Sequence, residues 1–383
     1  MAPPYSEKRD TVITQPVILT TEEKIERDRE LLQVRKKNSE LKAKYDRVLR
    51  EDSVTDRILA EARDLLPRLT PCEPPAPMKQ GDVEYEDAGL LRWADWHGDE
   101  IVDLAIMEGL NEYGPAIVTR RVMATIDKTV GLLRKRMPNT YFRDLHVHDL
   151  GDGITGWLHE ENMATNAAPP FRSLVFIAHL KASALRDLCG AFEHVYFRGV
   201  PGNHWRYLKK VPWKLPTENS DWLIYQLVQA LLADVPNISF DCPAAWSVFC
   251  EIEGHGFALN HGYTDAKGGF GGIPYYSLTR SDAKRSAIDA RLSRRVSYRE
   301  YGHLHDEAKI PRAAGGGNLI ICPSLKGGDE YAKEGLGGLY SDPAQLLSAV
   351  NRQHGVWWTA TLDVNDHDDA LECRYDPTMV VLG

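Results

Sequence analysis

The chain has 383 residues, of which 43% are hydrophobic, and a formal net charge of −9 at pH 7. This length and composition predict a soluble globular protein with one large core and room for an accessory segment. They argue against a membrane-spanning protein, because no run of about 18 apolar residues occurs, and against binding of nucleic acid through the whole acidic surface.

Two features bear on the cellular compartment. The N-terminus begins with Met1 and a polar, proline-containing stretch that lacks the apolar region of a secretory signal, so we expect a cytoplasmic protein. The six cysteines are scattered, without Cys-x-x-Cys spacing: Cys72, Cys189, Cys242, Cys250, Cys322 and Cys373. They fit free thiols in a reducing compartment better than a disulfide framework or a zinc site.

Residues 1–66 are predicted to form a disordered tail followed by a helical, coiled-coil-like extension. The segment Thr20-Thr-Glu-Glu23 has capping-box spacing and marks a helix start. Within 21–50, inward positions recur at alternating spacings of three and four, namely Leu31, Val34, Asn38, Leu41, Tyr45 and Val48. An Asn at one inward position is a known device for fixing helix register. We therefore expect the helix to pair with a second copy or a protein partner, or to lie on the larger domain of its own chain. A second helix is expected over 54–66.

Residues 67–81 contain five prolines and are predicted to be an extended linker. Beyond it, residues 82–383 alternate between strand-like and helix-like patterns, which predicts an α/β domain. Strands are expected at 88–94, in the stretch that ends at Asp152, and at 194–197, 246–252, 257–260, 319–322 and 357–362. Helices are expected at 115–136, in the stretch after Phe171, and at 222–232.

Metal-ligating residue types follow several of these strands. The glycine- and proline-containing turn 198–206 carries Asn203 and His204, and four further clusters are Asp95-Trp-His97, Gly151-Asp152, Asn260-His261-Gly262 and Gly302-His303-Leu-His305. Each cluster alone could be an ordinary tight turn, because Asn, Asp and Gly are common turn residues. Together they offer a mixed oxygen and nitrogen ligand set, which suits Mn²⁺, Fe²⁺, Zn²⁺ or Mg²⁺ and disfavours a thiolate-rich structural zinc site. Two such ions ~3.5–4 Å apart activate a hydroxide and neutralise a phosphoryl group.

The order and spacing of these five motifs over residues 88–325 resemble the calcineurin-like metallophosphoesterases. That resemblance implies an αββα sandwich of two mixed sheets. The segments Leu110-Asn-Glu-Tyr-Gly-Pro115 and Pro323-Ser-Leu-Lys-Gly-Gly-Asp-Glu-Tyr331 look, more narrowly, like the phage and prophage-encoded branch. Membership of that branch would put the protein in the host cytoplasm.

The resemblance implies a role for each motif residue. One metal would be bound by Asp95, His97, Asp152 and His305, and the other by Asp152, Asn203, His261 and His303. Two divalent ions are implied, manganese first, with iron, zinc, magnesium or nickel as alternatives. His204 would stabilise the transition state or protonate the leaving oxygen. From the residues themselves we add Arg206, whose guanidinium could clamp phosphate; the alternative is a surface arginine in a basic loop.

The sequence departs from the family pattern at one position. Family members often carry an acid directly after Gly-Asn-His, which orients the catalytic imidazole, whereas Trp205 stands there in this chain. Asp99 or Asp265 could replace that acid. Trp205 could instead stack on a base, which would favour a nucleotide substrate.

Charge patterning gives the substrate hypotheses. Residues 195–217 carry five Lys or Arg and no acid, with aromatic residues interleaved, and residues 280–299 carry seven basic residues against two acids. These stretches predict a locally positive crevice, or solvated basic helix faces. The leading hypothesis is a phosphodiesterase with nuclease-like activity on DNA. The alternatives are a phosphomonoesterase acting on phosphoprotein or nucleotide, and a non-catalytic phage scaffold protein.

Overall fold

The computed structural model describes residues 26–27, 29–37, 39, 59, 68–76, 85–137, 139–156, 165–204, 206, 211–267, 272–313, 316–365 and 375. Contacts along the chain divide it into two compact units, residues 1–57 and 58–383. None of the helices in the described residues combines the length and apolar character needed to cross a lipid bilayer. The five described cysteines are all free, as the sequence predicts.

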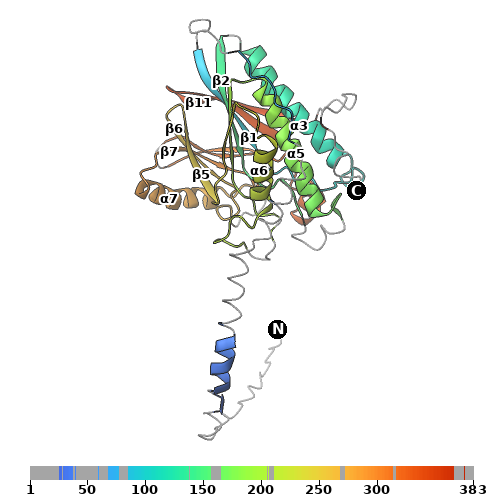
Figure 1. Cartoon of the computed structure of the whole chain (residues 1–383), viewed down its shortest axis with the longest axis vertical. Coiled ribbons are helices and arrows are strands. Elements are labelled where there is room, and N and C mark those ends of the chain that lie inside the picture. Colours follow the sequence, from blue (N-terminus) through green and yellow to red (C-terminus); the bar gives the residue numbers. More distant parts are fainter. Residues whose placement is uncertain are drawn as a thin grey trace, which may run out of the picture. The chain divides into compact units, whose positions relative to one another are not determined.

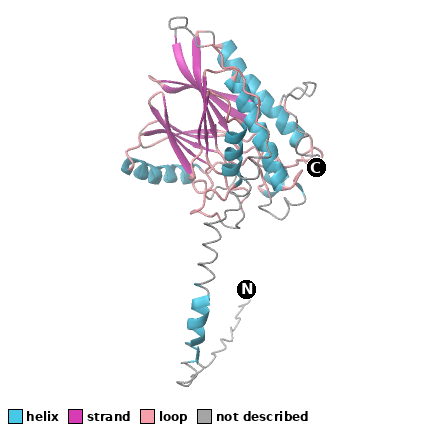
Figure 2. Cartoon of the chain, in the orientation of Figure 1, coloured by secondary structure: helices cyan, strands magenta, loops and turns pink. Residues whose placement is uncertain are grey.

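The larger unit is built on two mixed β-sheets (Figures 1 and 2). The first sheet has the strand order β11-β10-β1-β2-β3-β4. Its strands are β1 (Tyr85–Trp93), β2 (Thr140–Asp149), β3 (His194–Gly199), β4 (Ile238–Asp241), β10 (Ala344–Asn351) and β11 (Gly355–Asp363). Strands β1 to β4 run parallel, with Leu91 opposite Val147 and Val147 opposite Phe197, while β10 and β11 add an antiparallel hairpin.

The second sheet has the order β5-β6-β7-β9-β8. Its strands are β5 (Ser247–Ile252), β6 (His255–Asn260), β7 (Val296–Tyr301), β8 (Ala308–Pro311) and β9 (Asn318–Ile321). The three central strands β6, β7 and β9 are parallel, and the edge strands β5 and β8 pair antiparallel. Both sheets therefore have parallel centres, whose carboxyl ends are the usual place for a ligand site.

Helices cover the outer face of each sheet, which gives four layers. Helices α3 (Pro115–Val130), α5 (Pro170–Cys189) and α6 (Ser220–Leu231) lie against the first sheet, and α7 (Tyr275–Arg291) against the second (Figure 1). Along β1 the side chains alternate: Leu91 joins the core under the helices, whereas Leu90 joins the core between the two sheets. This alternation follows from the pleat of a strand. The predicted α/β fold with two mixed sheets is confirmed.

From residue 85 onward, the predicted strands and helices occur with small differences, whereas the helix predicted over 54–66 lies outside the described residues apart from Leu59. Strand β2 ends at Asp149, three residues before the expected end at Asp152, because the chain turns at Gly151, whose φ is 91°. The predicted helix over 115–136 starts with a proline at its first turn and continues after Val130 as a π-helix, η1 (Gly131–Arg136). A second short π-helix is η2 (Tyr331–Gly335). Strands β4, β7, β8 and β10 and helix α7 were not predicted.

Part of the proline-rich linker contacts the larger unit. Residues 68–76 have no helix or strand. The backbone N–H of Leu69 donates to the carbonyl of Leu231, at the end of α6. Cys72 Sγ lies 3.1 Å from the carbonyl oxygen of Arg186 in α5. These contacts hold at least this stretch of the linker against the helices of the first sheet. The predicted domain limits at residues 66 and 81 stay a prediction.

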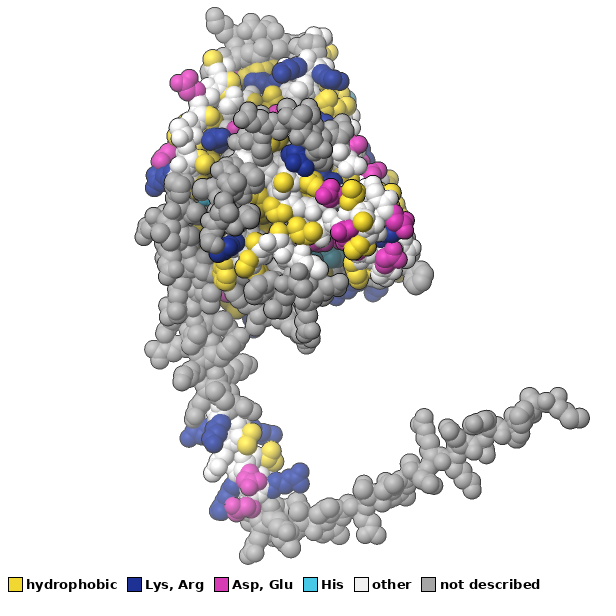
Figure 3. Space-filling view, turned by 90° about the vertical axis from the view of Figure 1, so that its right-hand side faces the viewer, with side chains coloured by type: hydrophobic (Ala, Val, Ile, Leu, Met, Phe, Trp, Pro, Cys, Tyr) yellow, Lys and Arg dark blue, Asp and Glu magenta, His cyan; other side chains and the backbone are white. Residues whose placement is uncertain are grey.

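The N-terminal unit is helical where it is described, at 26–27, 29–37 and 39. Leu31 and Val34 are about half exposed, at 47% and 54%. Basic, acidic and hydrophobic side chains lie together on this helix in Figure 3. Asn38 and the later heptad positions lie outside the described residues, so pairing through 21–50 stays a prediction.

Candidate metal centre

The predicted ligands converge at the carboxyl ends of five parallel strands from the two sheets. Asp95 and His97 follow β1, Asp152 follows β2, Asn203 and His204 follow β3, His261 follows β6, and His303 and His305 follow β7. Because both sheets direct these ends to the same region, residues more than two hundred positions apart in the sequence become neighbours. Their ligand atoms fall into groups whose members lie within 4.8 Å of one another.

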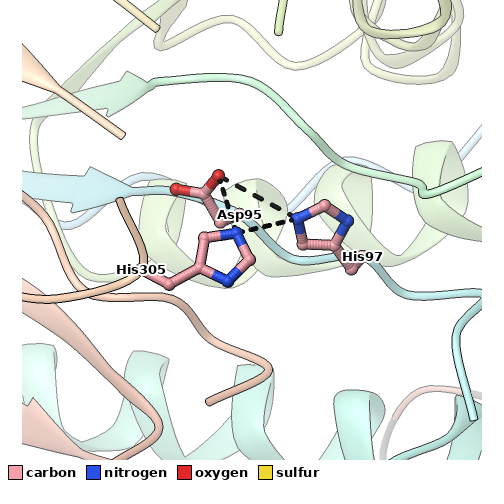
Figure 4. Close-up of side chains that lie close together, drawn as sticks. All are labelled: Asp95, His97 and His305. Atoms are coloured by element: carbon pink, nitrogen blue, oxygen red, sulfur yellow. Dashed lines mark hydrogen bonds and ion pairs between the residues drawn. The ribbon is translucent and has the colours of Figure 1, made fainter. Parts of the chain in front are cut away.

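One group contains Asp95, His97 and His305, whose side chains point toward a common centre (Figure 4). Nε2 of His97 lies 3.2 Å from Nε2 of His305 and 4.0 Å from a carboxylate oxygen of Asp95. Nε2 of His305 lies 3.5 Å from the same oxygen. Asp95 and His97 are fully buried, while the His305 side chain is 29% exposed. The group is therefore open to solvent on the His305 side.

A second group contains Asp152, His261 and His303. Nε2 of His261 lies 2.9 Å from Oδ2 of Asp152 and 2.9 Å from Oδ1 of Asn203. Asp152 also belongs to a third group with His97 and His204, so it stands between the first two. The structure thus brings the seven expected ligands into neighbouring groups, in which Asp152 is grouped with His97 and His204, and with His261 and His303, but not with Asp95 and His305.

The tautomer of two site histidines is fixed by the hydrogen bond of the ring nitrogen that faces away from the site. His261 Nδ1 lies 2.7 Å from the carbonyl oxygen of Leu150, an atom that can only accept. His97 Nδ1 lies 2.8 Å from Oγ1 of Thr155, whose hydroxyl donates to Glu100 Oε2 at 2.7 Å and so accepts from the ring. Nδ1 must be the donor in both rings, so each ring, whenever it is neutral, presents the Nε2 lone pair to the site, as metal-ligating histidines require.

This arrangement fits a bound cation. Around His261 Nε2 lie two further acceptors, Oδ2 of Asp152 and Oδ1 of Asn203, each at 2.9 Å. Burial lowers the pKa of His261, but the Asp152 carboxylate outweighs it and raises the pKa to about 10. Three buried acceptors around one point are unfavourable unless positive charge lies between them. The donor set contains oxygen and nitrogen and no thiolate, as hard and borderline divalent ions prefer.

The backbone at the site is strained. Eight non-glycine residues in the described chain have positive φ, and five of them are predicted ligands: Asp95 (52°), His97 (45°), Asp152 (57°), His303 (69°) and His305 (59°). The left-handed region costs a side-chain-bearing residue about 1–2 kcal/mol. Such strain persists only where the surrounding fold enforces it, and it gathers at functional sites.

Two glycines allow the ligand loops to approach one another. A Cβ on Gly202 would lie 2.0 Å from Oδ1 of Asp152, and a Cβ on Gly302 would lie 2.7 Å from Oδ2 of Asp95. Both distances are far below van der Waals contact. The glycines in the Gly-Asn-His and Gly-His-Leu-His motifs are therefore needed for the carboxylates to reach their positions.

His204 lies beside both groups. Its ring packs edge-on against His97, with 4.8 Å between ring centroids, and its backbone N–H donates to Asp152 Oδ1 at 2.8 Å. Its Nδ1 lies 3.3 Å from the carbonyl oxygen of Thr155. Burial lowers the pKa of His204, although nearby Asp152 opposes the shift. Nε2 is the ring nitrogen left for a substrate.

The acid expected to orient His204 is replaced by a backbone carbonyl. Asp99 accepts from the N–H groups of Thr155 (2.7 Å) and Gly156 (3.0 Å), so it holds the loop whose carbonyl faces His204. Asp265 is instead engaged in a two-bond ion pair with Arg285. Among the described residues, neither carboxylate is a hydrogen-bond partner of the His204 ring. Trp205 lies outside the described residues.

Arg206 lies close to the second group. Its Nη1 donates to the carbonyl oxygen of Asn203. Burial lowers the pKa of the Arg206 guanidinium, which nearby Tyr263 and Asp152 partly oppose. The proposed role as a phosphate clamp stays a prediction, because the guanidinium here contacts its own turn.

The structure adds residues that the sequence does not single out. Asp221, at the start of α6, accepts from the N–H groups of Asp152 (2.9 Å), Gly153 (2.8 Å) and Gly202 (2.8 Å). Burial, reinforced by the nearby Asp152 and Asp149 carboxylates, raises the pKa of Asp221 to about 6. One buried side chain thus ties the β2 and β3 loops together. The only sequence signal is the Asn219 cap that precedes the predicted helix.

The segments 110–115 and 323–331 pack against each other behind the first group. Asn111 Nδ2 donates to the carbonyls of Lys326 (3.0 Å) and Gly328 (2.7 Å). Lys326 is 2% exposed, and its ammonium lies 2.9 Å from Glu100, the carboxylate that accepts from Thr155. The two motifs therefore support the residues that orient His97.

Part of the basic charge seen in the sequence is balanced internally. Arg299 is 3% exposed and pairs with Asp282 (3.0 Å) and Asp289 (2.6 Å), and Arg285 pairs with Asp265 (2.7 Å). Five other basic residues of the 280–299 stretch are exposed: Arg280, Lys284, Arg291, Arg294 and Arg295. The stretch therefore contributes a smaller positive surface than its sequence indicates.

Comparison with known proteins gives weak likenesses only. No protein-family model matches the sequence, and no curated protein matches it either. Among solved structures, a predicted phosphoesterase from Streptococcus pneumoniae is 11% identical with a TM-score of 0.28, covering 72% of this chain and 98% of its own. An archaeal phosphodiesterase is 8% identical with a TM-score of 0.33, covering 71% and 99%. Vps29 from Entamoeba histolytica, solved with zinc, is 11% identical with a TM-score of 0.27, covering 72% and 99%. TM-scores of this size do not identify a shared function, so the functional argument depends on the site.

Proposed function

We propose that the chain is a metal-dependent phosphodiesterase, with nuclease-like activity on DNA as the first activity to test. The observation that carries the proposal is the position of Asp152, whose carboxylate lies within 4.8 Å of a ring nitrogen of both His97 and His261. A carboxylate between two sets of nitrogen and oxygen ligands is what a dinuclear centre needs. The motif order supports membership of the calcineurin-like metallophosphoesterases; the narrower phage-encoded branch stays a prediction from two sequence segments.

Each residue has a defined task in this proposal. Asp95, His97, Asp152 and His305 would hold one divalent ion, and Asp152, Asn203, His261 and His303 the other. Bound divalent ions supply Lewis-acid activation of water and neutralise phosphoryl charge. Manganese is the first ion to test, with iron, zinc, magnesium and nickel as alternatives.

His204 is the proposed proton carrier. Because its Nδ1–H points at the Thr155 carbonyl, only Nε2 can meet a substrate oxygen. Only the doubly protonated ring carries a proton at Nε2. That proton could pass to the leaving oxygen, which returns the ring to its neutral form, or it could hydrogen-bond to the phosphoryl group as negative charge builds up on it. Arg206, once rotated away from the Asn203 carbonyl, could add a second contact to the phosphoryl oxygens.

The test is a substrate panel on metal-supplemented protein. Bis-p-nitrophenyl phosphate, p-nitrophenyl phosphate, and single- and double-stranded DNA and RNA are offered with Mn²⁺ to wild type, His204→Ala and His194→Ala. His194 is a matched control, because it lies at the start of β3, at the opposite end of the strand from the site. There its Nε2 is hydrogen-bonded to the Ser239 hydroxyl of β4 (2.8 Å). We expect diester cleavage that EDTA abolishes and that falls about 10²–10⁴-fold in His204→Ala only.

The second candidate is a phosphomonoesterase. The internal ion pairs of Arg285 and Arg299 favour it, because they reduce the positive surface that a long nucleic acid would contact. Cleavage of p-nitrophenyl phosphate with every diester left intact would replace the first proposal by this one. Absence of bound metal by elemental analysis, with no activity at all, would support the non-catalytic alternative.

A further inference from the structure

A small pocket opens beside the second ligand group. It has a volume of about 80 Å³, and its wall includes the predicted ligands Asn203 and His261. The rest of its wall includes Trp213, Trp246, Asn260 and Tyr263. A single water needs roughly 10–15 Å³, so the pocket has room for a larger group. Any occupant would lie next to a phosphoryl group held at the candidate metal centre.

The pocket is bounded by aromatic side chains. Trp213 and Trp246 pack edge to face, with 5.4 Å between ring centroids, and Trp246 Nε1 donates to the Trp213 carbonyl at 3.0 Å. Trp213 is nevertheless 54% exposed and Tyr263 is 39% exposed. Tyr263 also lies edge-on to the predicted ligand His303, at 5.5 Å. Aromatic surface that is held rigidly and left exposed next to a reacting centre is suited to stacking on a flat ring.

Asn260, in the pocket wall, has a buried polar atom without a partner in the described part of the chain. Asn260 is 6% exposed, and its Oδ1 accepts no hydrogen bond from the described residues. A buried amide oxygen without a donor is unfavourable, so a ligand N–H that reached it would be bound favourably. Arg285, the one arginine that the described residues contribute to the wall, is already paired with Asp265 through two bonds (2.9 and 2.7 Å). The wall therefore favours a neutral ring with an N–H donor over a second phosphate.

We propose that this pocket binds the nucleobase of a nucleotide substrate whose phosphoryl group is held at the metal centre. A nucleobase has both features that the wall calls for, a flat π-face for the aromatic side chains and an N–H donor for Asn260. This inference rests on the proposed phosphodiesterase activity, because it assigns the substrate class of the same site. It names Trp213, Tyr263 and Asn260 as specificity-determining residues.

Binding to metal-free protein tests the pocket independently of catalysis. Thymidine, thymidine 5′-monophosphate and ribose 5-phosphate are titrated calorimetrically into wild type, Trp213→Leu, Asn260→Ala and the matched control Trp357→Leu. Trp357 is 46% exposed and donates to Asp87, outside the pocket. We expect wild type and Trp357→Leu to bind both thymidine compounds and to bind ribose 5-phosphate more weakly. Trp213→Leu should weaken thymidine binding about 10-fold, within the range known for loss of one stacking partner.

An activity ratio separates the two proposals. The kcat/KM for the p-nitrophenyl ester of thymidine 5′-phosphate is divided by that for methyl p-nitrophenyl phosphate. We expect this ratio to fall about 10-fold in Trp213→Leu, mainly through KM, and to stay unchanged in Trp357→Leu. If wild type cleaves both esters equally well and binds no thymidine at millimolar concentration, the pocket proposal is wrong while the phosphodiesterase proposal stands. If thymidine binds but no ester is cleaved, the proposed function fails instead.

Discussion

The carbonyl oxygen of Thr155 lies 3.3 Å from Nδ1 of His204, and the Thr155 hydroxyl lies 2.8 Å from Nδ1 of His97. Thr155 therefore sets the tautomers of two histidines. Its backbone carbonyl sets that of His204, the proposed proton carrier, and its hydroxyl sets that of His97, a proposed ligand. Glu100 accepts from the hydroxyl, and Asp99 accepts from the Thr155 N–H. The two functions can be separated by mutation, because a side-chain change leaves the carbonyl in place.

Thr155→Val is expected to weaken metal binding. Valine keeps the shape of the side chain but removes the acceptor for His97 Nδ1–H, so the ring is no longer held with Nε2 facing the site. Loss of a residue that orients a ligand typically costs 10–100-fold in metal affinity. The measurement is a calorimetric titration of Mn²⁺ or Zn²⁺ into metal-free protein.

Thr155→Ser supplies the control for that change, since serine retains the hydroxyl. It should bind metal within a few-fold of wild type. Equal affinities for Thr155→Val and wild type would show that the contact to His97 has no influence on the site.

Gly202→Ala is expected to abolish metal binding at the second group. Its Cβ would lie 2.0 Å from Oδ1 of Asp152, so the β3 turn or the carboxylate must move. A displaced ligand should cost metal affinity by about 100-fold or more, the upper end of the losses seen when supporting residues are changed. Stoichiometry by elemental analysis of protein dialysed against metal measures it.

Gly131→Ala is the matched glycine control. Gly131 has a right-handed helical conformation (φ −59°), and a Cβ there meets no atom within 4 Å. Alanine at such a position stabilises by about 0.4–1 kcal/mol through the unfolded state. Normal metal content in both alanine variants would contradict the argument from close approach.

Five of the seven proposed ligands could be placed from sequence because each follows a strand that the sequence predicts, whereas His303 and His305 follow β7, which was not predicted, and were found through the motif resemblance alone. Asp95 comes directly after the apolar run of β1, and His261 directly follows β6. Parallel strands bring their carboxyl ends to one edge, so residue type and strand end together define the site. Thr155 and Asp221 could not be found this way. The Thr155 carbonyl acts on the His204 ring, and the Asp221 carboxylate accepts from three backbone N–H groups, and neither contact produces a pattern in the sequence around the residue.

The elements that were not predicted lack distinctive patterns. Strand β10 (Ala-Gln-Leu-Leu-Ser-Ala-Val-Asn) is buried along almost its whole length, and such an apolar run cannot be told from a buried helix by periodicity. Helix α7 buries only Leu278 and Asp282, so it has no apolar stripe. The position of α7 depends on contacts with β7 and β9 that only the folded chain supplies.

Asp221→Asn is expected to destabilise the fold as well as the site. In wild type both carboxylate oxygens of Asp221 accept from backbone N–H groups. Asparagine keeps only one of these oxygens, and its NH₂ group would face N–H donors that then have no acceptor. Each unsatisfied buried N–H costs about 1–3 kcal/mol, while removal of a buried charge that Asp152 and Asp149 disfavour offsets part of that cost. We therefore expect a net loss of about 1–2 kcal/mol in the free energy of unfolding. Urea denaturation at neutral pH measures it.

Asp234→Asn serves as the aspartate control, because the Asp234 side chain is 53% exposed and pairs only with exposed Arg68 among the described residues. It should change stability by no more than about 1 kcal/mol. If Asp221→Asn were equally mild, the three backbone bonds to Asp221 would not be what holds the β2 and β3 loops together.

Stability in acid should depend on Glu300, which lies buried between the two sheets. Its carboxylate accepts from Arg92 and, at 2.6 Å, from His148 Nδ1. Burial would raise the pKa of Glu300, but Arg92 and then His148 outweigh it and lower the pKa from 4.5 to about 2. A carboxylate with a depressed folded-state pKa stabilises fully above its unfolded pKa and loses that contribution as pH falls toward the folded value. The contribution at neutral pH is on the order of 3 kcal/mol, and about 2 kcal/mol of it should be lost between pH 5 and pH 3.

Glu300→Gln removes this titration while it keeps the shape of the side chain. Urea denaturation of wild type and variant at pH 7, 5, 4 and 3 should therefore show a stability difference that is constant from pH 7 to 5 and shrinks below it. The variant also leaves Arg92 as a buried charge without its carboxylate, a penalty that persists at every pH. A difference that stays constant down to pH 3 would mean that the ionisation of Glu300 is not linked to folding.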